Sequence, residues 1–277
     1  AQVAWAVRVI VFEGERASFQ PSNRIPFGML YIGIPSHNEA STVGLLLWRL
    51  RSVMHEVARE YEILVFDDGS TDGTADILGS YSEVLPLTVL GGSTHVGYGR
   101  ALDALVRAAA ERTRYPRRDA LITMQADFTD RPEDLPELIK RFEGGGDIVV
   151  AERQLSPAWP RPARILQHFA TYITRSYLQP IVDSKDPFGT LRAYRVSVLR
   201  DAIKKWGDQP LVASHGWSAN AELLVRMSGL SRRTESTPSS PRYELRPRES
   251  RLRPWRGAVE LFQRARAISG AVKRAPA

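Results

Sequence analysis

Cysteine is missing from this 277-residue chain, and its absence excludes several kinds of site. Without thiols the chain has no disulfide bond, no thiolate metal site and no cysteine nucleophile, which fits a cytoplasmic location. No run of about 18 consecutive apolar residues occurs either, so no membrane-spanning helix is expected. Residues 1–26 are predicted to form an N-terminal arm. They lack the basic start that is typical of a signal peptide.

An acidic surplus is also missing, and the positive charge is concentrated at one end. From Arg242 onward ten Lys or Arg face three Glu, whereas the rest of the chain has 28 basic and 28 acidic residues. Residues 236–277 are predicted to be a basic, Pro- and Arg-rich segment with an amphipathic helix. This segment either contacts an anionic membrane at its inner face or is a solvated chain end. It has no recognisable nucleic-acid-binding module, so no nucleic-acid partner is expected.

What the chain does contain is a regular alternation of apolar strands and amphipathic helices. The predicted strands are residues 29–34, 61–66, 85–90, 120–124 and 147–151. Helices are predicted between them, and further helices at 165–178, 196–206 and 216–227. This order predicts an α/β fold with a mainly parallel sheet, in one domain spanning residues 27–235.

Three polar segments follow predicted strands. They are PSHNEA at 35–40, DDGSTDGT at 67–74 and QADFTD at 125–130. Ligands of parallel α/β sheets bind outside the carboxyl ends of the strands, so these segments are predicted to share one cleft. Taken singly, each is also compatible with an ordinary capped turn into a helix.

The second polar segment resembles the nucleotide-binding turn of family-two inverting glycosyltransferases. Asp67 and Asp68 end a strand, and Gly69 and Gly73 permit a tight turn. The resemblance implies the glycosyltransferase A-type fold, which is a Rossmann-like, mainly parallel sheet flanked by helices. It extends over residues 29–230.

Other segments resemble the same family in the same order. In the first-strand motif Pro35, Asn38 and Glu39 match, and His37 stands at the usual aromatic position. Residues 95–101 resemble the Asn-x-Gly-x-Gly-x-Ala stretch of the polyprenyl-phosphate sugar synthases, with His95 in place of Asn. Residues 186–195 resemble that subgroup's Phe-Arg-x-Tyr-Arg segment; the matching residues are Asp186, Gly189, Arg192, Tyr194 and Arg195.

The third polar segment departs from the Asp-Ala-Asp that is usual in the subgroup. Gln125 replaces the first Asp, while Asp127 keeps the position that usually touches the metal. Thr129 stands where the synthases often have Gln, another possible metal ligand. The resemblance implies Mg²⁺ or Mn²⁺, which prefer oxygen ligands and neutralise the charge of a leaving diphosphate.

A phosphate acceptor is implied by the arginines and by the lack of an obvious base. Arg153 matches the subgroup's Gly-Ser-Arg segment, and Arg161 and Arg164 lie in a loop resembling one that grips a lipid phosphate. A sugar-hydroxyl acceptor would need a base, but Glu222 lacks the Asp that usually follows, which leaves only His215 as an alternative. An ionised phosphate needs none.

The resemblance therefore implies a metal-dependent inverting hexosyltransferase that uses a UDP- or GDP-sugar and a polyprenyl phosphate. Transfer to a soluble saccharide and a non-catalytic nucleotide-sugar-binding protein are the alternatives. The expected catalytic residues are Asp127 and Arg153, and the expected metal ligands are Asp127 and Thr129. The expected binding residues are Pro35, His37, Asn38, Glu39, Asp67, Asp68, Gly97, Gln125, Ala126, Arg164 and Arg192.

Overall fold

A computed structural model describes most of the predicted domain. It covers residues 28–154, 164–165, 168–169, 172, 176, 182, 184–216, 218–240, 263 and 266. The predicted N-terminal arm, Arg161, most of the helix predicted at 165–178 and nearly all of the basic segment beyond 240 lie outside these residues. No helix within the described ranges has the length and apolar content that crossing a bilayer requires.

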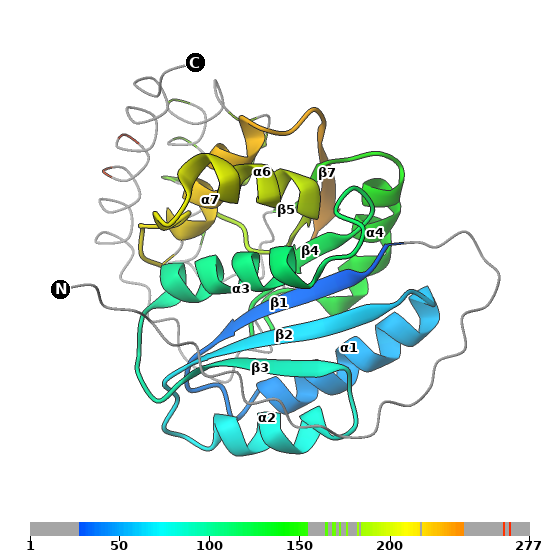
Figure 1. The fold of residues 1–277 in the computed structure, drawn as a ribbon, viewed down its shortest axis with the longest axis vertical. Coiled ribbons are helices and arrows are strands. Elements are labelled where there is room, and N and C mark those ends of the chain that lie inside the picture. The colour runs from blue at the N-terminus through cyan, green and yellow to red at the C-terminus, as the bar shows by residue number, and fades with distance from the viewer. Residues whose placement is uncertain are drawn as a thin grey trace.

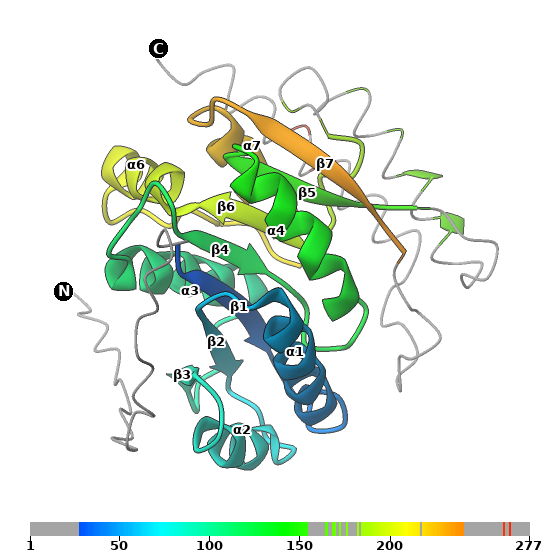
Figure 2. The same ribbon diagram turned by 90° about the vertical axis from the view of Figure 1, so that its right-hand side faces the viewer.

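Within the described residues seven strands form one sheet in the order β3-β2-β1-β4-β6-β5-β7 (Figure 1, with β6 labelled in Figure 2). The strands are β1 (Leu30–Ser36), β2 (Tyr61–Asp68), β3 (Leu87–Gly92), β4 (Ala120–Thr123), β5 (Ile148–Arg153), β6 (Arg192–Arg195) and β7 (Thr234–Ser239). All neighbours pair in parallel except β6, which is antiparallel to β4 and β5. The predicted α/β class and mainly parallel sheet are therefore confirmed.

Helices cover both faces of the sheet (Figure 2). They are α1 (Val43–Val57), α2 (Thr74–Ser82), α3 (Tyr98–Arg112), the 3-10 turn η1 (Pro132–Asp134), α4 (Leu135–Glu143), α6 (Val196–Trp206) and α7 (Ser218–Ser228). Successive strand residues point to opposite faces, so Leu64 packs with α3, α6 and α7 while Ile63 and Val65 pack with α1 and α4. Burial on both faces explains why these strands are continuous apolar runs.

The last strand corrects the boundary expected at residue 235. The Pro- and Ser-rich composition predicted an irregular segment from 236, but β7 continues to Ser239 along β5. Ser236 pairs in register with Val150, and Gln154 N–H donates to Ser239 O at 2.8 Å. Pro238 is tolerated because β7 is an edge strand, where a missing N–H can face away from the sheet.

The first two strands end at one edge of the sheet, and the segment after β4 leaves towards that same edge. Ser36 pairs in register with Asp67, and Gly33 pairs with Thr123, after which Met124 N–H donates to Gly33 O at 3.0 Å. The three polar segments leave the sheet at these points. The three polar segments therefore meet at the carboxyl ends of β1, β2 and β4, which is where the common cleft was predicted.

Candidate active site

The first two polar turns are fastened to each other by hydrogen bonds. N–H groups of the first turn donate to side chains of the second: Asn38 to Ser70 Oγ at 2.9 Å, Glu39 to Thr74 Oγ1 at 2.9 Å and Ala40 to Asp72 Oδ2 at 3.1 Å. Asn38 has a φ of 55°, a left-handed conformation that Asn tolerates better than most residues. Pro35 precedes this turn in β1, buried and in register with Phe66. The two turns therefore form a single wall.

His37 takes part in this link through both of its ring nitrogens. Thr71 N–H donates to Asn38 Oδ1 at 2.7 Å, which leaves Asn38 Nδ2 to donate to His37 Nε2 at 3.3 Å. His37 Nδ1 lies 2.7 Å from Asp68 O, which can only accept. Only the neutral imidazole with its hydrogen on Nδ1 satisfies both contacts. At the position usually aromatic, His37 therefore joins the turns as well as presenting a ring.

The two histidines that depart from the family pattern lie against each other. The ring centroids of His37 and His95 are 4.4 Å apart, with the planes tilted by 45°. His95 Nδ1 is 3.1 Å from Asp68 O and 3.1 Å from Asp68 Oδ2, while 59% of its side chain stays exposed. This edge of the cleft therefore presents imidazole groups where the resemblance led us to expect an aromatic ring and an amide.

Asp67 and Asp68 lie in the wall, with their carboxylates bonded to the protein itself. Asp68 is 3% exposed and accepts N–H groups of Val96 at 2.5 Å and Gly97 at 3.0 Å. Asp67 Oδ1 accepts the N–H of Ser70 at 3.2 Å. Asp68 thus holds Gly97, the residue that caps the start of α3, and its carboxylate is engaged by backbone N–H groups.

The third turn carries the expected metal residues. Asp127 is half-buried, and its Oδ1 accepts the N–H of Thr129 at 3.0 Å. Gln125 is half-buried beside the buried Ala126, and Phe128 has a φ of 64°. A positive φ in a bulky residue is uncommon and concentrates at functional sites.

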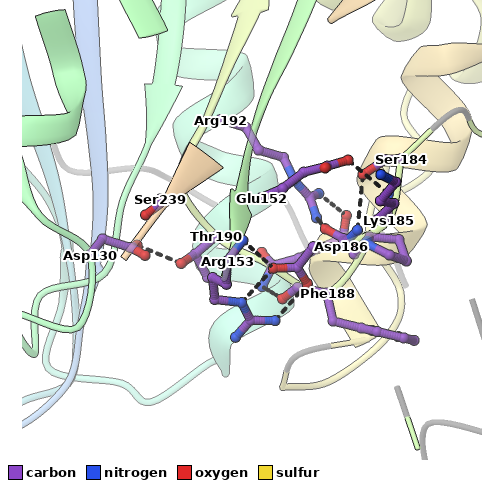
Figure 3. Close-up of polar contacts among 12 residues, drawn as sticks. Asp130, Glu152, Arg153, Ser184, Lys185, Asp186, Phe188, Thr190, Arg192 and Ser239 are labelled. Atoms are coloured by element: carbon purple, nitrogen blue, oxygen red, sulfur yellow. Dashed lines mark hydrogen bonds and ion pairs between the residues drawn. The ribbon is translucent and has the colours of Figure 1, made fainter. Parts of the chain in front are cut away.

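Asp130 is a member of this turn that sequence reasoning missed. It is 3% exposed, and its Oδ2 accepts the N–H of Gln125 at 2.9 Å and the hydroxyl of Thr190 at 2.5 Å (Figure 3). Burial raises the pKa of Asp130 to about 6, against these two hydrogen bonds, and the nearby charge of Asp127 adds to the rise. The signal was present in the sequence, since QADFTD ends in a second acid.

The residues of this turn fit a divalent cation. Thr129 Oγ1 is buried and has no hydrogen-bond partner among the described residues, and it shares the turn with the Asp127 carboxylate. Both are oxygen ligands, which Mg²⁺ and Mn²⁺ prefer. Within the described ranges no group of three His, Cys, Asp or Glu has metal-binding geometry. A cation here would complete its shell with phosphate oxygens and water, as Mg²⁺ commonly does.

Arg153 is held by a buried ion pair. Its Nε lies 2.5 Å from Asp186 Oδ2 and its Nη2 2.7 Å from Asp186 Oδ1, with the two side chains 7% and 3% exposed (Figure 3). Burial alone would raise the pKa of Asp186, but the charge and hydrogen bonds of Arg153 hold that pKa below its usual value. The guanidinium fork expected to grip the acceptor phosphate is thus engaged by a carboxylate.

Arg192 is not brought to the cleft but lies inside the core. It is 1% exposed and donates to the backbone oxygens of Asn220 at 2.5 Å, Asp186 at 3.3 Å and Pro187. Its role in this structure is to hold the turn that carries Asp186. The match to the family's Phe-Arg-x-Tyr-Arg segment therefore marks a structural residue, and not the expected binding residue.

The remaining candidates are divided between occupied and exposed side chains. Glu222 accepts the N–H of Ser214 at 2.8 Å and an Arg226 N–H at 2.8 Å, so it is engaged in structure. His215 is exposed. Arg164 is half-buried, and its side chain makes no hydrogen bond or ion pair with a described residue.

The glycosyl transferase family 2 profile matches residues 31–202, a span that contains all three polar turns. The chain belongs to glycosyl transferase family 2. This membership confirms the predicted family. The match covers more than half of the chain, and the three polar turns lie within the matched family 2 domain.

Relatives of this family 2 chain carry names that agree with the predicted subgroup. An undecaprenyl-phosphate 4-deoxy-4-formamido-L-arabinose transferase of Pseudomonas aeruginosa (strain LESB58) is 33% identical over 178 residues, covering 63% of this chain and 49% of the relative. An undecaprenyl-phosphate mannosyltransferase of Micrococcus luteus is 30% identical over 210 residues, covering 74% of this chain and 80% of the relative. The chain thus spans about half the length of the first relative.

Solved structures agree on the fold. Glucosyl-3-phosphoglycerate synthase of M. tuberculosis superposes with a TM-score of 0.64 at 14% identity, covering 88% of this chain and 81% of its own. Mannosyl-3-phosphoglycerate synthase of Rubrobacter xylanophilus gives 0.58 at 15% identity, covering 90% and 76%. The predicted glycosyltransferase A-type fold is confirmed.

Proposed function

We propose that this family 2 domain transfers a hexose from a UDP- or GDP-sugar to a polyprenyl phosphate, with inversion at the anomeric carbon. The observation that carries the proposal is that three polar turns leave neighbouring parallel strands at the same end of the sheet, with Asp127 on the third. The acceptor class is supported by the undecaprenyl-phosphate relatives, whose names give two different sugars. Such an acceptor lies in a membrane, so the domain would work at a cytoplasmic membrane surface. Contact through the basic segment stays a prediction, because residues 241–277 lie almost wholly outside the described ranges.

The donor would lie against the wall formed by the first two turns. Their mutual hydrogen bonds keep Asn38 and Glu39 beside the end of β2, so this wall is ordered before a nucleotide arrives. A wall that is already ordered lowers the entropic cost of binding. We expect Glu39 and His37 to face the nucleoside, while Asp68 supports Gly97 from behind.

The diphosphate would lie at the third turn. Asp127 and Thr129 would hold Mg²⁺ or Mn²⁺ there, and the cation neutralises the charge that develops on the leaving diphosphate. Metal dependence is supported by a solved complex of the M. tuberculosis synthase that contains Mn²⁺ and UDP. That structure superposes on this chain with a TM-score of 0.61. The backbone N–H of Gln125 donates to Asp130 Oδ2. Its side-chain amide is a candidate contact for a ribose hydroxyl.

The acceptor side relies on positioning and not on a base. A phosphate is already ionised at neutral pH, and Glu222 is engaged in structure, so we assign no proton transfer to the chain. Because Asp186 holds the Arg153 fork, we propose that Arg153 is a positioning residue. Its ion pair fastens the end of β5 to Asp186. Thr190, which follows four residues later, donates its hydroxyl hydrogen to Asp130 on the third turn.

The decisive test compares Asp127→Asn with a matched acid that lies outside the cleft. Transfer of labelled sugar to polyprenyl phosphate is measured with Mn²⁺, and Asp127→Asn is expected to lower the rate by about 10²–10³-fold. Asp76→Asn, an exposed acid on α2, should retain wild-type activity. Equal rates for both variants would contradict the assignment of Asp127.

Two further measurements separate the alternatives. A nucleoside diphosphate or nucleotide sugar is expected to raise the unfolding temperature, and more so with Mn²⁺. If none does, the donor site is wrong. Transfer to a soluble saccharide without lipid would favour the soluble-acceptor alternative. Donor binding without any transfer would favour the non-catalytic one.

A further inference from the structure

Four arginines gather around a groove at the end of the sheet where β4 begins, opposite the three polar turns. The groove encloses about 490 Å³ and is lined by Arg114, Tyr115, Pro116, Arg117, Arg118, Ser197, Arg200 and Asp201. It lies between the loop that joins α3 to β4 and the first turns of α6. Because β4 begins at this edge with Ala120 and leads to the third polar turn at its other end, the groove is separate from the proposed donor site.

The lining of this groove carries more positive than negative charge. Asp201 is the only carboxylate in it, against four guanidinium groups, of which Arg118 and Arg200 already have partners in the protein. Arg114 and Arg117 are exposed, and neither side chain makes a hydrogen bond or ion pair with a described residue. Elsewhere in the described structure arginines are commonly paired, as Arg59 is with Glu143 at 2.7 Å. A concave surface with uncompensated positive charge attracts anions.

The groove is also held in shape, so that it does not depend on loose surface side chains alone. Ser197 N–H donates to Pro116 O at 2.7 Å, which ties the loop to the start of α6. Arg200 donates to Ala110 O at 3.0 Å and Thr113 O at 3.2 Å, which fixes its guanidinium over the end of α3. The 11-residue helix α6 begins at this groove, and its N-terminal dipole adds positive potential.

We propose that this groove is a second anion-binding site that takes a phosphate-bearing ligand. Arg114 and Arg117 supply the direct contacts, and Arg200 is the fixed guanidinium beside them. Arginine suits this task because its planar fork matches phosphate oxygens with two hydrogen bonds. The same phosphate chemistry is offered by a soluble phosphomonoester and by a lipid headgroup. The site is independent of the sugar transfer proposed above.

The test uses the full chain and two double variants of equal charge change. Arg114→Gln/Arg117→Gln removes the direct contacts. Arg51→Gln/Arg232→Gln is the control, since both side chains are exposed and lie outside the groove. Binding is measured by calorimetry with inorganic phosphate and by co-sedimentation with phosphatidylcholine vesicles, with or without phosphatidic acid. The groove variant is expected to weaken binding by about tenfold or more, the size of one lost charge-assisted hydrogen bond.

The two probes separate the sources of the phosphate. A selective loss of inorganic phosphate binding assigns the groove to soluble ligands, and a loss confined to phosphatidic acid vesicles assigns it to a lipid headgroup. Equal weakening in the groove and control variants, or no binding of either probe by wild type, would overturn the proposal. Thermal unfolding checks that both variants fold. The donor-induced rise in unfolding temperature should persist in the groove variant, so failure here is distinct from failure of the donor site.

Discussion

Replacing Asp186 by Asn would leave the Arg153 guanidinium charged and buried without its counter-ion. The pair is bidentate, Arg153 N–H also donates to Asp186 Oδ2 at 3.2 Å, and the side chains are 7% and 3% exposed. Removing one partner of a buried pair typically costs about 3–5 kcal/mol. Asn retains one oxygen acceptor, so we expect a loss of about 3 kcal/mol in the free energy of unfolding at neutral pH.

The same variant should show a defined pH dependence. The pKa of Asp186 is held below its usual value in the folded protein, by Arg153 against the opposing effect of burial. A lowered pKa contributes stability that is present above the unfolded-state pKa of about 4 and is lost as pH falls through the folded-state pKa. The stability difference between wild type and Asp186→Asn should therefore be largest near neutral pH and shrink below about pH 4.

Urea unfolding followed by tryptophan fluorescence measures these differences. Glu143→Gln is the matched control, because Arg59 and Glu143 form a pair of similar geometry but are 22% and 28% exposed. Such a pair is worth about 0–1 kcal/mol. Adding Arg153→Met to Asp186→Asn removes the stranded charge and should recover part of the loss. The reasoning is refuted if Asp186→Asn lowers the free energy of unfolding no more than the control does. It is also refuted if the effect of Asp186→Asn does not change with pH.

Two smaller predictions concern the walls of the cleft. Burial raises the pKa of Asp130 to about 6. In metal-free buffer the stability that the protonated carboxyl contributes is therefore complete below about pH 4 and is lost as pH rises through about 6. Urea titrations of Asp130→Asn should not show this fall in the free energy of unfolding. Gly91 has a φ of +96° and an added Cβ would meet Asp67 O at 2.2 Å, so Gly91→Ala should lower the unfolding free energy by about 1–3 kcal/mol. Gly92→Ala, with nothing within 4 Å, should be far milder, and equal effects would refute the close approach.

Much of the architecture could be predicted because its causes are local in the sequence. Apolar runs and three-to-four-residue spacings set which segments become strands and helices, and α6 at Val196–Trp206 begins and ends where its periodicity predicted. The position of the three polar turns at one end of the sheet followed from chain order, since parallel strands carry their carboxyl ends to the same side. The end of the last strand did not follow, because the composition of 236–239 resembles a loop and only an open edge of β5 makes it a strand.

The fold class, the three turns and the family could be predicted from local patterns, because strand and helix periodicity and turn chemistry depend on neighbouring residues. The roles of the individual side chains became clear from contacts in the folded protein. The insertion of antiparallel β6 between β4 and β5 brings Thr190 to Asp130 and Asp186 to Arg153, and it buries Arg192. His37, which follows β1, and His95, which follows β3, likewise meet because both rings lie against the backbone oxygen of Asp68 at the end of β2. Such partners are set by sheet order and burial, which depend on contacts between residues far apart in the chain.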